Sequence, residues 1–264
     1  MRPSLSTLAP ARRRLVLVLA ALLALVLVAG VVVLLTSRDG SGGDVDQAEP
    51  GPVIVLPGYG GGTEPLDPLV SALRSEGRDV VVFKPTENEQ GDLRVQARLL
   101  GRLASQTMRR TDASSVDVVG FSAGGVIARI YVRDEGGADV VRRVLTLGSP
   151  HHGSEIAGTA VELAGDCPEG CRQLAPGSDL LRQLNAGDET PAGPLWTTVR
   201  SDADQTVTPT VSARLDGALN LRVQALCPQA TTAHTDIPGD PVTLAALSTV
   251  LGAGKPRSPR DVSC

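Results

Sequence analysis

Aromatic residues are scarce in this chain of 264 residues, since phenylalanine, tryptophan and tyrosine together make up 2% of it. A core built from this sequence must therefore be aliphatic, and a substrate pocket would be lined mostly by valine, leucine, isoleucine and alanine. Histidine is scarce too, with three residues in the whole chain. Any site that depends on a histidine base consequently has few candidates.

Phosphate-binding motifs are also missing. Residues 57–62 read Pro-Gly-Tyr-Gly-Gly-Gly after a short apolar run, but no G-x-G-x-x-G opens a helix there and no Gly-Lys-Ser or Gly-Lys-Thr follows. This excludes a nucleotide cradle at that loop. We expect no cofactor. Either a plain glycine turn or a loop that offers a backbone N–H to a reacting oxygen fits the stretch.

No metal site is expected. His151 and His152 are adjacent, but neighbouring side chains point in different directions and no carboxylate or cysteine cluster stands at ligand spacing. Hydrogen bonding beside a functional site is the better interpretation of this pair.

After the N-terminal arginines, acidic residues outnumber basic ones. Arg2, Arg12, Arg13 and Arg14 precede an apolar run at residues 15–35, and the remaining 21 basic residues face all 29 acidic ones, a net charge near −8. An acidic exterior argues against nucleic acid or an anionic surface as the main partner.

The apolar run at residues 15–35 is long enough to cross a bilayer as a helix. It is longer than the apolar region of a signal peptide and lacks a clear small-x-small cleavage site. We therefore predict a basic cytoplasmic N-terminus at 1–14, an uncleaved transmembrane anchor at 15–35 and an extracellular remainder. Secretion after cleavage is the alternative. Residues 36–52 have the composition of a flexible linker.

Apolar strands and helical stripes alternate from residue 53 onward without an internal repeat. This order predicts an α/β fold with a mostly parallel sheet and helices on both faces, in one domain at 53–264. We expect strands at 53–56, 79–83, 116–121, 140–147, 195–199 and 221–226, and a last helix at 244–251.

Ser122 stands at the centre of this pattern. Residues 120–124, Gly-Phe-Ser-Ala-Gly, form a G-x-S-x-G elbow between a valine-rich strand and a helical stripe, as a nucleophilic serine requires. In that chemistry the N–H of the following residue, Ala123, helps to bind an oxyanion, and Tyr59 in the glycine-rich loop is the candidate second donor.

A nucleophilic serine needs a base, and the expected chain order is serine, acid, histidine. His151 and His152 follow the fourth strand, so His234, after the last strand, is the candidate base. The acid should follow the strand at 195–199, where Asp202 and Asp204 both qualify. The pattern of residue types alone does not separate the two aspartates.

The chain resembles the small bacterial lipases and esterases of the class 2 type, in the α/β-hydrolase superfamily, over nearly all of 53–251. The resemblance rests on five stretches: 55–61, 118–125, 147–153, 201–209 and the His234 loop with residues 240–242. It implies an acid that precedes x-x-Val-x-Pro, which selects Asp204, and an oxyanion donor at Tyr59. Pro57 departs from the histidine usual in these lipases.

Between residues 153 and 194 the chain leaves the strand and helix rhythm. This insertion, with Val161 and Leu181 on its apolar stripes, could wall an acyl pocket or simply pack on the sheet. Four cysteines allow three pairings. We predict the pairs Cys167–Cys171 and Cys227–Cys264 outside the cell.

Together these observations predict a monomeric, membrane-tethered serine hydrolase acting on carboxylic esters, with lipids or small esters as partners and no nucleic acid. An acyltransferase or thioesterase would use the same site. A hydrolase fold that only binds its ligand is the alternative from another class.

Overall fold

The computed structural model describes residues 23–24, 45–86, 90–164 and 167–264. The chain divides into two compact units, 1–41 and 42–264. Apart from Leu23 and Ala24, the predicted anchor lies outside the described residues, as does the basic N-terminus. Within the described residues, no helix combines the length and apolar character needed to span a bilayer.

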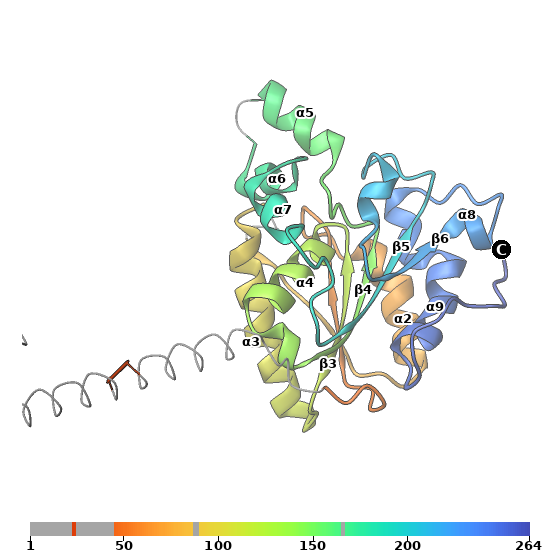
Figure 1. Cartoon of the computed structure of the whole chain (residues 1–264). Helices are drawn as coiled ribbons and strands as arrows, with labels where there is room; N and C mark the ends of the chain where they lie inside the picture. Colours follow the sequence, from red (N-terminus) through yellow and green to blue (C-terminus); the bar gives the residue numbers. More distant parts are fainter. Residues whose placement is uncertain (1–22, 25–44, 87–89, 165–166) are drawn as a thin grey trace, which may run out of the picture. The chain divides into compact units, whose positions relative to one another are not determined.

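A single sheet of six parallel strands organises the second unit, in the order β2-β1-β3-β4-β5-β6 (Figure 1). The strands are β1 (Val53–Leu56), β2 (Val80–Val82), β3 (Val116–Phe121), β4 (Val141–Leu147), β5 (Leu195–Arg200) and β6 (Leu219–Arg222). Because all strands run the same way, the loops that follow them meet at one edge of the sheet.

Helices cover both faces of this sheet. They are α2 (Asp67–Ser75), α3 (Leu93–Thr111), α4 (Ala123–Asp134), α5 (Glu155–Ala164), α6 (Glu169–Leu174), α7 (Asp179–Leu184), α8 (Val223–Leu226) and α9 (Pro241–Leu251). Short 3-10 turns lie at η2 (Glu64–Leu66), η4 (Gly137–Asp139), η5 (Thr210–Ala213) and η6 (His234–Gly239).

Side-chain alternation along the strands sorts the core into two layers. Ile54 and Val118 point to the face covered by α3, α4 and α7, whereas Val55 and Val119 point to the face covered by α2 and α9 (Figure 1). Both layers are almost wholly aliphatic, as the scarcity of aromatic residues predicts. The α/β fold with helices on both faces of a parallel sheet is confirmed.

The predicted strand at residues 221–226 is wrong from Val223 onward. β6 ends at Arg222, which pairs with Arg200 at the end of β5, and Val223–Leu226 form the short helix α8. The reason is the loss of a partner: β5 stops at Arg200, so a longer β6 would leave its backbone groups unpaired on that side.

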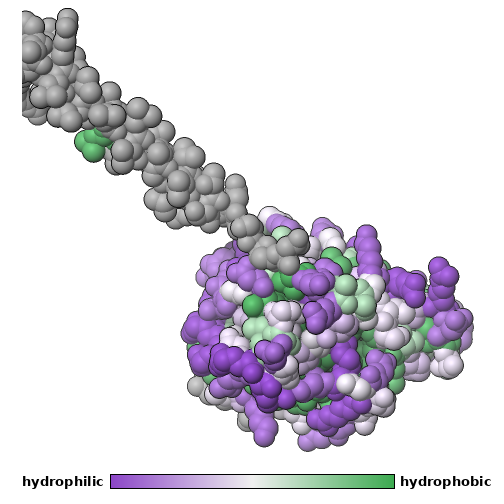
Figure 2. Space-filling view, turned by 90° about the horizontal axis from the view of Figure 1, so that it is seen from below, coloured by the Kyte–Doolittle hydropathy of each residue, from purple (hydrophilic) through white to green (hydrophobic). Residues whose placement is uncertain are grey.

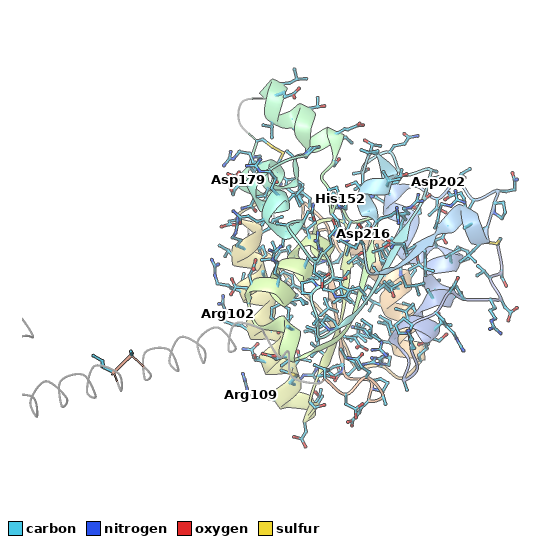
Figure 3. All side chains as sticks on the ribbon, viewed as in Figure 1. Arg102, Arg109, His152, Asp179, Asp202 and Asp216 are labelled. Carbon is cyan, nitrogen blue, oxygen red and sulfur yellow. A yellow bond between two sulfur atoms is a disulfide. The ribbon has the colours of Figure 1, made fainter. Side chains whose placement is uncertain are left out.

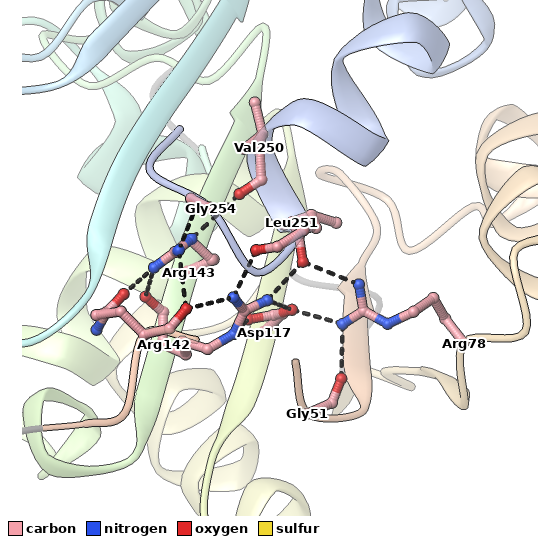
Figure 4. A network of polar contacts seen from close by, with 10 residues as sticks. Gly51, Arg78, Asp117, Arg142, Arg143, Val250, Leu251 and Gly254 are labelled. Carbon is pink, nitrogen blue, oxygen red and sulfur yellow. Dashed lines mark hydrogen bonds and ion pairs between the residues drawn. The ribbon is translucent and has the colours of Figure 1, made fainter. Parts of the chain in front are cut away.

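A cluster of buried charges closes the amino end of the sheet (Figure 4). Asp117 of β3 accepts hydrogen bonds from Arg142 (2.9 and 2.6 Å) and from Arg78 (2.6 Å). Arg142 and its neighbour Arg143, both 0% exposed, also donate to backbone carbonyl groups at the end of α9 and beyond, and to Gln47. Burial lowers the pKa of Arg143 to about 10.

The contact with Gln47 shows that part of the predicted linker is bound to the domain. Residues 36–52 have a linker composition, yet the backbone carbonyl of Gln47 accepts from Arg142 and Arg143, both at 3.1 Å. Buried guanidinium groups need more acceptors than one aspartate provides. The segment from residue 45 to β1 supplies some of them.

Two disulfides, Cys167–Cys171 and Cys227–Cys264, join all four cysteines. The predicted pairing is confirmed. The first bridge joins the loop ahead of α6 to a residue within that helix, and the second ties Cys264 to the residue after α8.

Candidate active site

Ser122 lies in a sharp turn between β3 and α4 at the carboxyl end of the sheet. Its backbone has φ 51° and ψ −122°, a combination that side-chain-bearing residues rarely adopt. The turn is closed by small neighbours: a Cβ on Gly120 would lie 2.5 Å from the nitrogen of Gly125, and one on Gly124 would lie 2.5 Å from the carbonyl oxygen of Pro57. The G-x-S-x-G pattern is thus explained by close backbone approach.

The structure brings Ser122, His234 and Asp204 together in one chain of hydrogen bonds. Ser122 Oγ lies 3.0 Å from His234 Nε2, and His234 Nδ1 lies 2.7 Å from Asp204 Oδ2. All three side chains are buried, with the serine and the histidine each 8% exposed. With Nδ1–H donated to the carboxylate, Nε2 is free to accept the serine proton.

Asp204 is held by its own backbone surroundings. Its Oδ1 accepts the N–H groups of Thr206 and Val207 at 2.8 and 2.9 Å, which leaves Oδ2 for His234. The other candidate, Asp202, points elsewhere and pairs with Arg200 and Arg222 at 2.7 and 3.0 Å. The geometry therefore favours the aspartate that the family resemblance selected.

The predicted oxyanion donors lie beside the serine. A Cβ on Gly58 would come within 2.9 Å of the Ser122 Cβ, so the loop after β1 packs directly against the nucleophile. Within the described part of the chain, the backbone N–H groups of Tyr59 and Ala123 have no hydrogen-bond acceptor. Free N–H groups on both sides of a nucleophile are what a developing oxyanion requires.

Ser122 opens into an apolar cavity of about 380 Å³. Its wall comes from the loop after β1, the loop after β4, α5, α6 and the loop after β5. The lining residues are Tyr59, Pro150, Ser154, Ile156, Ala157, Ala160, Cys167, Pro168, Cys171, Leu174, Thr206 and Val207. The volume lies within the range of ordinary ligand pockets, and Ser122 forms part of the lining.

The insertion at 153–194 contributes to this pocket, but through other residues than those singled out from the sequence. Ile156 and Ala160 of α5 line it, whereas Val161 lies outside its lining on the same helix. Leu181, 1% exposed, packs in the core against the sheet face with α3 and α4. The two interpretations of the insertion therefore hold for different parts: α5 and α6 wall the pocket, and α7 packs into the core beside α4.

His151 and His152 do not act together. His151 is 0% exposed with its Nε2 3.0 Å from Thr146 Oγ1, and burial lowers its pKa well below the usual range, so the ring is neutral. His152 instead reaches Glu189 at 2.8 Å. Within the described residues, no group of three histidine, cysteine or acidic side chains could hold a metal ion.

Two residues near the site carried no role in the sequence analysis. Gly148 follows β4 with φ 55°, and a Cβ there would lie 3.2 Å from His234 Nδ1 and 3.3 Å from Asp204 Oδ2. The Phe121 ring packs against the His234 imidazole, with centroids 4.9 Å apart. A glycine directly after a buried strand was the one available signal for Gly148.

Solved structures share this fold. Lipase B of Aspergillus fumigatus has a TM-score of 0.68 at 20% identity and matches 82% of this chain, which in turn spans 56% of that lipase. The mature lipase BlEst2 of Bacillus licheniformis has a TM-score of 0.64 at 18% identity, covering 79% of this chain and 94% of its own. The predicted α/β-hydrolase fold, and the likeness to lipases of that fold, are confirmed.

One family model, described as palmitoyl protein thioesterase, matches residues 52–184. The match covers half of the chain, from β1 to the end of α7, and includes Ser122 and the pocket helices α5 and α6. The prediction of a hydrolase of the lipase and thioesterase type is confirmed at this level. The chain belongs to the palmitoyl protein thioesterase family.

Proposed function

We propose that this protein hydrolyses esters of aliphatic acyl groups through an acyl-enzyme on Ser122. His234 Nε2 takes the serine proton as Oγ attacks the acyl carbonyl, and Asp204 stabilises the resulting imidazolium. The N–H groups of Tyr59 and Ala123 hold the oxyanion. His234 then protonates the leaving oxygen, and a water molecule repeats the sequence to release the acid.

The position of Ser122, hydrogen-bonded to His234 at the mouth of an apolar cavity, carries this proposal. An aliphatic lining buries a hydrocarbon chain at about 25 cal/mol per Å² of apolar surface and offers few partners to a polar one. The acyl part of the substrate is therefore the part that the cavity favours, and a lipid or a small aliphatic ester meets that requirement.

A fluorophosphonate probe tests the proposal, because it forms a covalent adduct with an activated serine. We expect labelling of the wild-type protein and none of Ser122→Ala. Ser154→Ala is the matched control, since Ser154 lines the same cavity but lies outside the hydrogen-bonded chain, and it should label normally. Absence of labelling in the wild type would favour the ligand-binding alternative.

Thioester hydrolysis is the second candidate, favoured by the family to which residues 52–184 match. The acyl-enzyme is common to both reactions, and the leaving atom differs. Comparing kcat/KM for an octanoyl oxygen ester and an octanoyl thioester of similar alcohol and thiol parts decides between them. A faster thioester reaction would make the protein a thioesterase. Partition of the acyl group between water and added alcohol tests an acyltransferase.

We propose that the protein lies on the outer side of a cell membrane and that the apolar run at residues 15–35 anchors it there. The two disulfides support an oxidising compartment. Protease treatment of intact cells should degrade the catalytic domain, and alkaline carbonate should leave the protein in the membrane. Release by carbonate with loss of the first residues would indicate secretion. Light scattering in detergent tests the expected monomer.

A further inference from the structure

A second cavity, of about 610 Å³, lies on the face covered by α3 and α4 and shares no residue with the pocket at Ser122. Its wall is formed by α3, the end of α4 and the residues that lead into β4. Figure 3 shows Arg102 and Arg109, two of its lining residues, along α3 on the side of the domain away from α9. The proposed hydrolase chemistry makes no use of this cavity.

Arginine side chains dominate the charge of this cavity. Arg98, Arg102 and Arg109 line it from one face of α3, where residues three, four or seven positions apart share a side. The one carboxylate of the lining, Glu135, lies 3.5 Å from Arg98. The side chains of Arg102 and Arg109, both exposed, have no hydrogen-bond or ion-pair partner among the described residues. A positive site has thus formed in a domain with a net negative charge.

Tyr131 adds a neutral donor to the same wall. The residue is 3% exposed, and its hydroxyl has no hydrogen-bond partner among the residues that the structure describes. The hydroxyl oxygen itself is not closed off from solvent, so a ligand in the cavity can reach it. Burial raises the pKa of Tyr131 to about 12, so the hydroxyl keeps its proton at neutral pH.

Two glycines make room for this tyrosine. A Cβ on Gly101 of α3 would lie 3.1 Å from the Tyr131 ring, and one on Gly137 would lie 2.9 Å from it. Glycine inside a helix destabilises it by about 1 kcal/mol relative to alanine. Gly101 therefore lowers the stability of α3 at the position where the Tyr131 ring packs against it.

We propose that this cavity binds a phosphate-bearing small molecule or lipid headgroup, held by Arg98, Arg102, Arg109 and the Tyr131 hydroxyl. Guanidinium groups bind phosphate oxygens through paired N–H bonds, and a tyrosine hydroxyl donates to a further oxygen. The volume exceeds that of a lone phosphate and falls in the range of ligand pockets, about 300–1,000 Å³. The aromatic ring and Val140 provide an apolar wall for the rest of the ligand.

Calorimetric titration of the full chain in a non-ionic detergent and phosphate-free buffer tests this site. The probes are glycerol 1-phosphate, for a soluble ligand, and the dihexyl ether analogue of phosphatidylglycerol below its micelle concentration, for a headgroup whose chains Ser122 cannot hydrolyse. We expect saturable binding of at least one probe. Arg102→Ala and Tyr131→Phe should each weaken it, the former by about tenfold or more, as loss of a bond to a charged group implies.

Arg94→Ala is the matched control, because Arg94 lies on the same helix outside the cavity, bonded to Gln183, and it should bind like the wild type. Ester hydrolysis should be unchanged in all three variants, which separates this site from the proposed function. Binding of neither probe, equal binding by all variants, or equal binding of glycerol, which lacks the phosphate, would overturn the proposal. A preference for one phosphate probe identifies the source of the ligand.

Discussion

The two ends of the sheet both bury charged or titratable side chains, but they hold them differently. At the carboxyl end, His234 is joined to Ser122 and to Asp204 by one hydrogen bond each. At the amino end, Asp117 is bonded by two arginines, and Arg142 donates to three backbone carbonyl groups in addition. His234 thus makes two side-chain hydrogen bonds, whereas Arg142 makes several to Asp117 and to backbone carbonyl groups.

This difference indicates what each end can do. A proton moves from Ser122 to His234 only if each partner can change its hydrogen bonds during the reaction. The arginine cluster offers no such freedom, because every shift would leave a buried guanidinium group without an acceptor. His234, with one hydrogen bond on each ring nitrogen, is therefore suited to proton transfer, whereas the many bonds at the amino end are suited to stability.

The surface seen from below is mostly hydrophilic, with scattered hydrophobic patches (Figure 2).

The largest expected effect is on activity, at the carboxyl end. In Asp204→Asn the side chain can still accept the N–H groups of Thr206 and Val207, but it no longer selects the imidazole tautomer. We expect kcat to fall by about 10⁴-fold with little change in Tm. Asp202→Asn, the neighbouring aspartate paired with Arg200, should stay near the wild type. An equal decrease of kcat in the two variants would show that Asp204 is not the residue that orients His234.

At the amino end the expected effect is on stability. Asp117→Ala leaves Arg142 buried without its carboxylate, and breaking such a pair costs about 3–5 kcal/mol. Urea unfolding measures this loss, while kcat per folded molecule should stay near that of the wild type. Asp79→Ala, which removes the exposed partner of Arg110, should change stability little. A large loss of kcat in folded Asp117→Ala would contradict the assignment of the amino end to stability alone.

A substitution that narrows the pocket at Ser122 should have a smaller effect, on the preference for acyl-chain length. Ala160→Phe places a ring in the cavity beside Ser122, so kcat/KM for an octanoyl ester should fall by about tenfold or more relative to acetate. Val161→Phe is the control on the same helix, outside the cavity lining. Both esters are assayed in parallel. Equal changes for acetate and octanoate in Ala160→Phe would show that α5 does not contact the acyl chain.

The smallest expected effect is a pH dependence of stability from His151. Burial keeps its folded pKa well below the usual value, so the unfolded chain takes up a proton below about pH 6.5 and the folded protein does not. The free energy of unfolding should therefore decrease as the pH falls below that value, by up to about 1.4 kcal/mol per pH unit. His151→Gln should flatten this slope between pH 6.5 and 5. An unchanged slope would assign it to other groups.

Much of the fold follows from local patterns in the sequence. The valine-rich strand before Ser122 and the helical stripe after it predict β3 and α4, because each element must bury one side in an aliphatic core. The order of serine, acid and histidine adds the remaining members of the site, since parallel strands deliver their following loops to one edge. These predictions use only residues close together in the sequence and a known sheet direction.

What could not be predicted depends on contacts between distant residues. Leu221 and Val223 have the same local character, but only the first has a partner in β5, so the strand ends between them. The helical period of α5 likewise shows an apolar stripe without showing that Ile156 and Ala160, rather than Val161, meet the pocket. Apart from Asp117, Arg142 and Arg143 donate to carbonyl groups of Gln47, Gly252 and Gly254, which lie about a hundred residues before or after them in the sequence.

The position of Gln47 has a mechanical consequence. The chain enters the folded domain through a backbone carbonyl held by two buried arginines, and the same arginines hold the carbonyl groups at the end of α9. The segment that begins at residue 45 and the C-terminal helix are therefore fastened to β4 by the same two side chains. This attachment lies at the end of the sheet opposite Ser122 and uses none of the residues of the Ser122–His234–Asp204 chain.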